Sequence, residues 1–123
     1  MTLQELYGSI GGNYEQALRV LRVEKLLDKH IRKFAANGVV DSLLSAGDAM
    51  DPTQMFETAH AAKGVCGNLG LTELYALASE LSEEFRPGNA RQLSDEAVRE
   101  KLGQVAVLYE KAKDSIQAYT QGA

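Results

Sequence analysis

Apolar residues in the C-terminal half of the chain recur in alternating steps of three and four, and this spacing restricts the fold more than any other feature. One run is Leu71, Leu74, Ala78, Leu81 and Phe85, and a second is Val98, Leu102, Val105, Tyr109, Ala112, Ile116 and Tyr119. This spacing places an apolar stripe along one side of an amphipathic helix. No segment sustains the period of two that a half-buried strand needs. The sequence therefore predicts an all-α chain.

Capping signals mark where the helices begin. Thr2 and Glu5 have the spacing of a capping box, and Asn13 can cap a second helix. Asp51-Pro52-Thr53-Gln54 combines a capping Asp with Pro at the first helical position, and Ser94-Asp95-Glu96 is a similar start. We expect the helices to end near glycines or loop residues. The ends so marked are Gly11-Gly12, Asn37-Gly38, Gly47 and Pro87-Gly88-Asn89.

These signals predict four longer helices that share one core, at about 23–36, 51–68, 71–86 and 94–120. Shorter helices precede them, and another short one carries Val40, Leu43 and Leu44. Because short connections make successive helices antiparallel neighbours, we expect an up-down antiparallel four-helix bundle with short additional N-terminal helices. The length of 123 residues suits a single domain, residues 1–123.

Composition excludes several classes of function. The net charge of −4 disfavours nucleic acid or an anionic membrane as the main partner, because both select a basic face. The single cysteine cannot form an internal disulfide or a Cys-type zinc site. The N-terminus lacks the layout of a secretory signal, and no run is apolar enough to span a bilayer. We expect a soluble, cytoplasmic, monomeric protein, and Met1 with the compact length favours a freestanding one.

The predicted helix over 51–68 carries the most informative residues. Its apolar stripe is Met55, Ala59, Ala62, Cys66 and Leu69. At about 100° per residue, four other residues fall together on the side away from that stripe. They are His60, Lys63, Gly64 and Gly67. We therefore expect the His60 side chain to be exposed in the middle of the helix.

The two glycines on this face need an explanation, because Gly in a helix interior costs about 1 kcal/mol relative to Ala. Gly64 and Gly67 follow His60 by four and seven residues, so they lower the surface beside the imidazole. The sequence predicts that this is where a partner backbone approaches, although Gly67 could instead belong to a frayed helix end. Phe56 lies on the border between core and patch and could belong to either, and Asn68 extends the patch as a docking residue.

The residue types on this face suit covalent phosphoryl chemistry. A neutral imidazole has a free lone pair and can accept a group that it later releases. Lys63, one turn along, can bring its ammonium over an anion held on His60. A lysine beside a metal ligand would repel the ion, so no metal site is predicted here.

The segment His60-Ala61-Ala62-Lys63-Gly64, closed by Asn68-Leu69-Gly70, resembles the histidine-containing phosphotransfer (HPt) domain of multistep phosphorelays. The resemblance covers nearly the whole chain and includes Lys33-Phe34, Gly47-Asp48 and Phe85-Arg86-Pro87-Gly88. It implies a phosphoryl carrier without independent ATP turnover and without a cofactor of its own. Its partners would be the receiver domains of a hybrid sensor histidine kinase and of a response regulator, with Mg²⁺ on the receiver. His60 would be phosphorylated, Lys63 would support the phosphoryl group, and Gly64 would leave room for the receiver.

One branch of this family fits less well. Phosphotransfer domains of chemotaxis kinases pair the histidine with a glutamate on the next helix, but here Leu81 is followed by Ser82. Exchange with receivers is therefore favoured over the kinase-substrate domain of a larger sensor kinase, although Glu80 or Glu83 could still reach His60. A second alternative is a helical adaptor that docks receivers without carrying phosphate.

A third alternative is a metal or haem bundle, because Glu57 and His60 have the Glu-x-x-His spacing of di-iron proteins. This spacing occurs once, and His60 is expected to point outward. We expect no function for His30, and a core position for Cys66. The three tyrosines Tyr75, Tyr109 and Tyr119 are expected to seal the core, and the three glutamates Glu80, Glu83 and Glu84 to form a solvated face.

Overall fold

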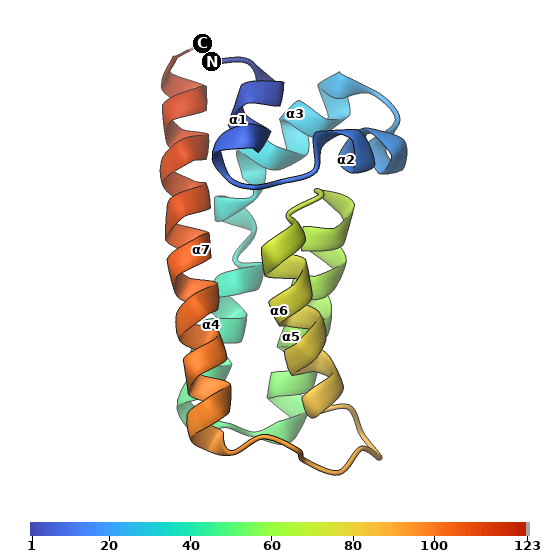
Figure 1. The fold of residues 1–123 in the computed structure, drawn as a ribbon, viewed down its shortest axis with the longest axis vertical. Helices are drawn as coiled ribbons and strands as arrows, with labels where there is room; N and C mark the ends of the chain where they lie inside the picture. The colour runs from blue at the N-terminus through green and yellow to red at the C-terminus, as the bar shows by residue number, and fades with distance from the viewer. Residues whose placement is uncertain (123) are drawn as a thin grey trace.

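The computed structural model describes residues 1–122 and consists of helices joined by short loops (Figure 1). It contains seven α-helices and one short 3₁₀ helix, with no strand among the described residues. The all-α prediction is confirmed. The elements are α1 (Leu3–Ser9), α2 (Tyr14–Leu21), α3 (Glu24–Lys33), η1 (Ala35–Asn37), α4 (Val39–Ala49), α5 (Pro52–Asn68), α6 (Thr72–Glu84) and α7 (Asp95–Gln121).

The predicted capping residues begin four of these helices. The side chains of Thr2, Asn13, Asp51 and Ser94 accept hydrogen bonds from backbone N–H groups of the first turn, at 3.0–3.1 Å. Pro52 occupies the first turn of α5, where its missing N–H leaves no bond unmade. Local side-chain chemistry therefore determines where α1, α2, α5 and α7 start.

Helices α4, α5, α6 and α7 run alternately down and up and enclose the long part of the core (Figure 1). The four-helix bundle is thus confirmed, but its first member is α4 rather than the predicted helix over 23–36. That segment forms the shorter α3, which lies with α1 and α2 beyond one end of the bundle. Val40 and Leu43 of α4 are fully buried, because α4 presents its apolar face to α5 and α7.

The N-terminal helices are tied to the end of α5. The Tyr7 hydroxyl donates to the carbonyl of Leu69 at 2.6 Å, and the Asn13 N–H donates to the carbonyl of Gly70 at 2.7 Å. Gly70 has a φ of +67°, and a Cβ there would collide with the carbonyl oxygen of Asn13. The end of the histidine-bearing helix is therefore fixed by backbone contacts that only glycine permits.

Helix α7 continues past the bundle and reaches the N-terminal helices, as Figure 1 shows. Tyr109 and Tyr119 are buried on this helix and seal the core as predicted. Tyr109 donates a hydrogen bond of 2.9 Å to Asp41 of α4, and Tyr119 donates one to Asp28 of α3. None of the helices in residues 1–122 combines the length and apolar character required to cross a membrane.

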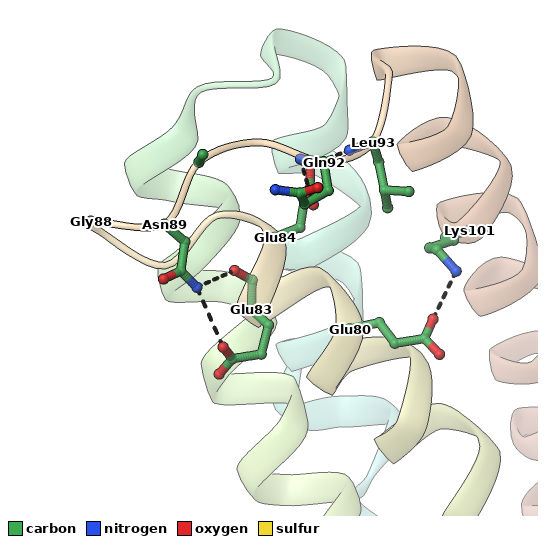
Figure 2. A pocket seen from close by; sticks show the side chains of 9 residues that line it. Glu80, Glu83, Glu84, Gly88, Asn89, Gln92, Leu93 and Lys101 are labelled. Atoms are coloured by element: carbon green, nitrogen blue, oxygen red, sulfur yellow. Dashed lines mark hydrogen bonds and ion pairs between the residues drawn. The ribbon is translucent and has the colours of Figure 1, made fainter.

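Glu84 holds the loop between α6 and α7. It is buried, so the prediction that it belongs to a solvated face is wrong. Its side chain is 5% exposed and accepts hydrogen bonds from the backbone N–H groups of Gln92 and Leu93 (Figure 2). It also accepts one from the Nε of Arg91. Burial acts to raise the pKa of Glu84, but these hydrogen bonds and the Arg91 charge lower it overall. Glu84 thus anchors the loop that follows Phe85.

Candidate functional site

His60 lies in the middle of α5 with its side chain exposed, as the helical geometry predicts. The opposite side of the same helix is buried in the core through Met55, Ala59, Ala62 and Cys66. The imidazole therefore stands on a helix whose apolar face is fixed by packing, and its ring nitrogens are open to a partner.

Phe56 belongs both to the core and to the patch. It is half-buried against the core, and its ring stacks on the imidazole of His60 with centroids 5.5 Å apart and planes inclined by 22°. The guanidinium carbon of Arg86 lies 5.6 Å from the centroid of the same Phe56 ring. Phe56 thus provides a flat support for the imidazole, and its ring brings Arg86 of the α6–α7 loop close to His60.

The charges near His60 form a small cluster. Glu83 pairs with Arg86 at 2.7 Å and is also within electrostatic reach of Lys63. The hydrogen bond from Arg86 is the largest influence that lowers the pKa of Glu83, and the Lys63 charge lowers it further. Sequence analysis assigned a role to Lys63 and missed Arg86, although Arg86 was quoted in the family resemblance. What reveals Arg86 is its tertiary contact with Phe56, which depends on where the end of α6 lies relative to α5.

The two glycines of the patch have different surroundings. A Cβ on Gly64 would meet no atom within 4 Å, so the surface beside His60 is open there as expected. A Cβ on Gly67 would lie 3.2 Å from the ring of Tyr75, which therefore covers part of the expected bare stretch. Tyr75 itself is 40% exposed, so the prediction that it seals the core is wrong. It packs over Gly67 instead. Asn68, at the end of α5, is exposed.

Glu80 and Glu83 of α6 are engaged with groups other than His60. Glu80 forms an ion pair with Lys101 of α7 at 2.8 Å (Figure 2). The Glu83 carboxylate accepts hydrogen bonds from Arg86 and Asn89. Ser82 is fully buried, and its Oγ has no hydrogen-bond partner among the described residues. The end of α6 and the loop after it thus bring one cation, Arg86, to the Phe56 ring beside His60, while the carboxylates of Glu80 and Glu83 are paired with other groups.

The geometry does not support the metal-bundle alternative. That reading needs Glu57 and His60 to project into the core, whereas both are exposed. Within residues 1–122, no three His, Cys, Asp or Glu side chains lie close enough together to bind a metal ion. Cys66 is 1% exposed, and burial raises the pKa of its thiol to about 12, so it is a core residue as predicted.

Comparison with known proteins identifies the type of domain. A family model described as the Hpt domain matches residues 15–118, which is most of the chain. Neither the curated proteins nor the solved structures gave a match.

Proposed function

The chain belongs to the Hpt domain family, and from that membership we propose that His60 is its phosphorylated residue. Domains of this family carry phosphoryl groups on histidine in phosphorelays and are modules rather than independent enzymes. The observation that supports the assignment is the exposed imidazole of His60, which lies in the middle of α5 beside the open surface at Gly64. The other histidine, His30, lies on α3 outside the bundle.

The proposed reaction is a reversible transfer between two nucleophiles. The lone pair of one neutral imidazole nitrogen attacks the phosphorus of an aspartyl phosphate on a receiver domain. The phosphorus–oxygen bond breaks, the aspartate leaves as a carboxylate, and a phosphorus–nitrogen bond forms on His60. The same step in reverse passes the phosphoryl group to the aspartate of a second receiver. The chain contributes positioning, and the receiver contributes the Mg²⁺ that neutralises charge in the transfer.

Lys63 and Arg86 supply the cations for the phosphorylated state. A phosphoryl group brings a charge of about −1.5 to −2 to the face where Glu83 already holds Arg86 and attracts Lys63. Because the phosphoryl group carries more negative charge than a single carboxylate, it competes with Glu83 for both cations. We infer that Lys63 and Arg86 turn from Glu83 toward the phosphoryl group when His60 is modified.

Gly64, Phe56, Gly67 and Asn68 form the docking face in this proposal. A partner loop can approach the backbone at Gly64, while the Phe56 ring holds the imidazole upright. Exchange with cytoplasmic receivers is favoured over phosphorylation by an attached kinase domain. Ser82 is buried and Glu80 is paired with Lys101, so neither supplies an orienting carboxylate to His60.

The test is incubation with a panel of receiver domains that have been phosphorylated with a small phosphodonor. We expect acid-labile, alkali-stable phosphate on the wild-type chain and none on His60→Gln. His30→Gln is the matched control and should still accept phosphate at saturating receiver. Phosphate on His60→Gln, or its loss in His30→Gln, would contradict the assignment. Receiver binding without phosphate on either histidine would identify the chain as an adaptor.

A further inference from the structure

The charges of this chain are distributed unevenly along the sequence. Residues 13–38, which include α2 and α3, contain six Lys and Arg and three Asp and Glu, which leaves +3. The rest of the chain contains seven Lys and Arg and fourteen Asp and Glu, which leaves −7. An acidic protein therefore has a basic unit at one end of its bundle, next to the end of α5 (Figure 1).

A cleft of about 310 Å³ lies where this basic unit meets the histidine-bearing helix. Its apolar side comprises Leu21, Val65 and Leu69, and its polar side comprises His30, Lys33, Asn37 and Asn68. None of the described residues that line it is acidic. Arg32, the neighbour of Lys33, is paired with Asp28 at 2.9 Å, whereas Lys33 has no ion pair within residues 1–122. The cleft thus presents an exposed, uncompensated ammonium above an apolar floor.

The cleft is within reach of any partner that is seated on His60. Asn68 follows His60 by eight residues, which is about 12 Å along the axis of α5 at ~1.5 Å per residue. Even a small transient interface covers about 600 Å² on each partner, which corresponds to a patch of about 14 Å radius. A receiver centred on His60 and Gly64 therefore extends over Asn68, which lines the cleft together with Lys33.

We propose that this cleft, with Lys33 as its central charge, binds an acidic segment of the receiver that exchanges phosphate with His60. The inference rests on the proposed function and adds a recognition element outside the reacting residues. Charge complementarity selects the occupant, because the cleft belongs to the basic unit and its described lining includes Lys33 and no carboxylate, which favours an acidic segment of the receiver. A charge at the rim of an interface acts mainly on the association rate, so Lys33 steers the receiver and takes no part in the transfer step.

The experiment measures phosphoryl transfer from a phosphorylated receiver under subsaturating conditions, at several concentrations of NaCl. The variants are Lys33→Gln, Lys33→Glu and the control Lys111→Glu, which makes the same charge change on the outer side of α7, diagonal to α5 in the bundle. We expect Lys33→Glu to lower the second-order rate constant roughly three- to tenfold at low salt and to flatten its salt dependence. Lys33→Gln should lie between it and the wild type, and Lys111→Glu should match the wild type.

Several outcomes would overturn the proposal. One is an equal effect of Lys33→Glu and Lys111→Glu, which would reflect net charge alone. Another is a lower rate at saturating receiver, which would place Lys33 in the transfer step. Loss of self-association in Lys33→Glu with unchanged transfer would assign the cleft to a second copy of the chain. The proposed function fails separately, when the wild type accepts no phosphate from any receiver, and the cleft proposal then fails with it. Circular dichroism of each variant confirms that the fold is retained.

Discussion

Replacement of Gly64 by leucine should raise stability and abolish transfer at the same time. Gly64 lies inside α5, is exposed, and would give an added Cβ no neighbour within 4 Å. The helix propensity gained on going from Gly to Leu is about 0.8 kcal/mol, with no steric cost to offset it. For a domain of this size such a gain raises Tm by about 3 °C.

The same side chain obstructs the site. Gly64 follows His60 by one helical turn, about 6 Å along the axis, and lies on the face that the receiver must approach. Reacting atoms must come within about 3–3.5 Å, and a displacement of about 1 Å costs about 100-fold in rate. We therefore expect Gly64→Leu to slow transfer by at least about 100-fold, and Gly64→Ala to have a smaller effect on transfer.

Gly103 supplies the matched control. It is also exposed inside a long helix, α7, and a Cβ there would meet nothing within 4 Å. Gly103→Leu should therefore raise Tm by a similar amount and leave transfer unchanged. The assays are thermal unfolding by circular dichroism and the rate of transfer from a phosphorylated receiver. Transfer by Gly64→Leu at the wild-type rate, or equal impairment in Gly103→Leu, would refute the argument that Gly64 is kept for access.

Three further predictions concern charge and burial. Lys63→Ala should shorten the lifetime of the phosphorylated form about tenfold without preventing phosphorylation, which decay of labelled protein measures, and Arg86→Ala should have a smaller effect in the same direction. Glu84→Ala should destabilise the fold by about 2–3 kcal/mol in urea unfolding, because the partly buried N–H groups of Gln92 and Leu93 and the Arg91 guanidinium lose their acceptor. The pKa of Glu84 is lowered, so its contribution is present above its ordinary pKa and is lost as the pH falls through the folded value. Glu84→Gln should therefore flatten the acid limb of stability. Cys66 should react with a thiol reagent at pH 8 at least about 100-fold more slowly in the native state than in urea, because its pKa is raised to about 12.

The features that follow from local periodicity could be predicted from the sequence. The cap at Asp51 and the stripe through Met55 and Cys66 define both the bounds of α5 and its buried side. Once these are known, the exposure of His60 follows from about 100° of rotation per residue. The same rotation places Gly64 on the exposed side, where a Cβ would meet none of the described atoms within 4 Å.

The features that depend on tertiary placement could not be predicted. The segment over 23–36 has an amphipathic pattern like that of a bundle helix, but it forms α3, which lies beyond the end of the bundle. The fourth helix of the bundle is α4, whose apolar pattern in the sequence is shorter. Periodicity reports that a helix has an apolar side and does not report which helices share it. Tyr75 illustrates the same limit, since its ring lies over Gly67 only because α6 packs antiparallel against α5.

Glu83 and Glu84 are adjacent in the sequence, but Glu83 belongs to the charge cluster near His60 and Glu84 holds the loop after α6. About 100° of helical rotation places Glu83 on the exposed side, where it holds Arg86 beside Phe56. The same rotation places Glu84 against the loop, where it accepts backbone N–H groups eight and nine residues ahead. Arg86 lies at the start of that loop, so its position near His60 depends on both glutamates. Glu83 pairs with it directly, and Glu84 holds the loop that carries it. Because a buried acceptor holds the loop from within, the exposed pair of Glu83 and Arg86 can exchange partners without loss of the fold. This division of roles is what a carrier needs when its charge changes by about two units at every transfer.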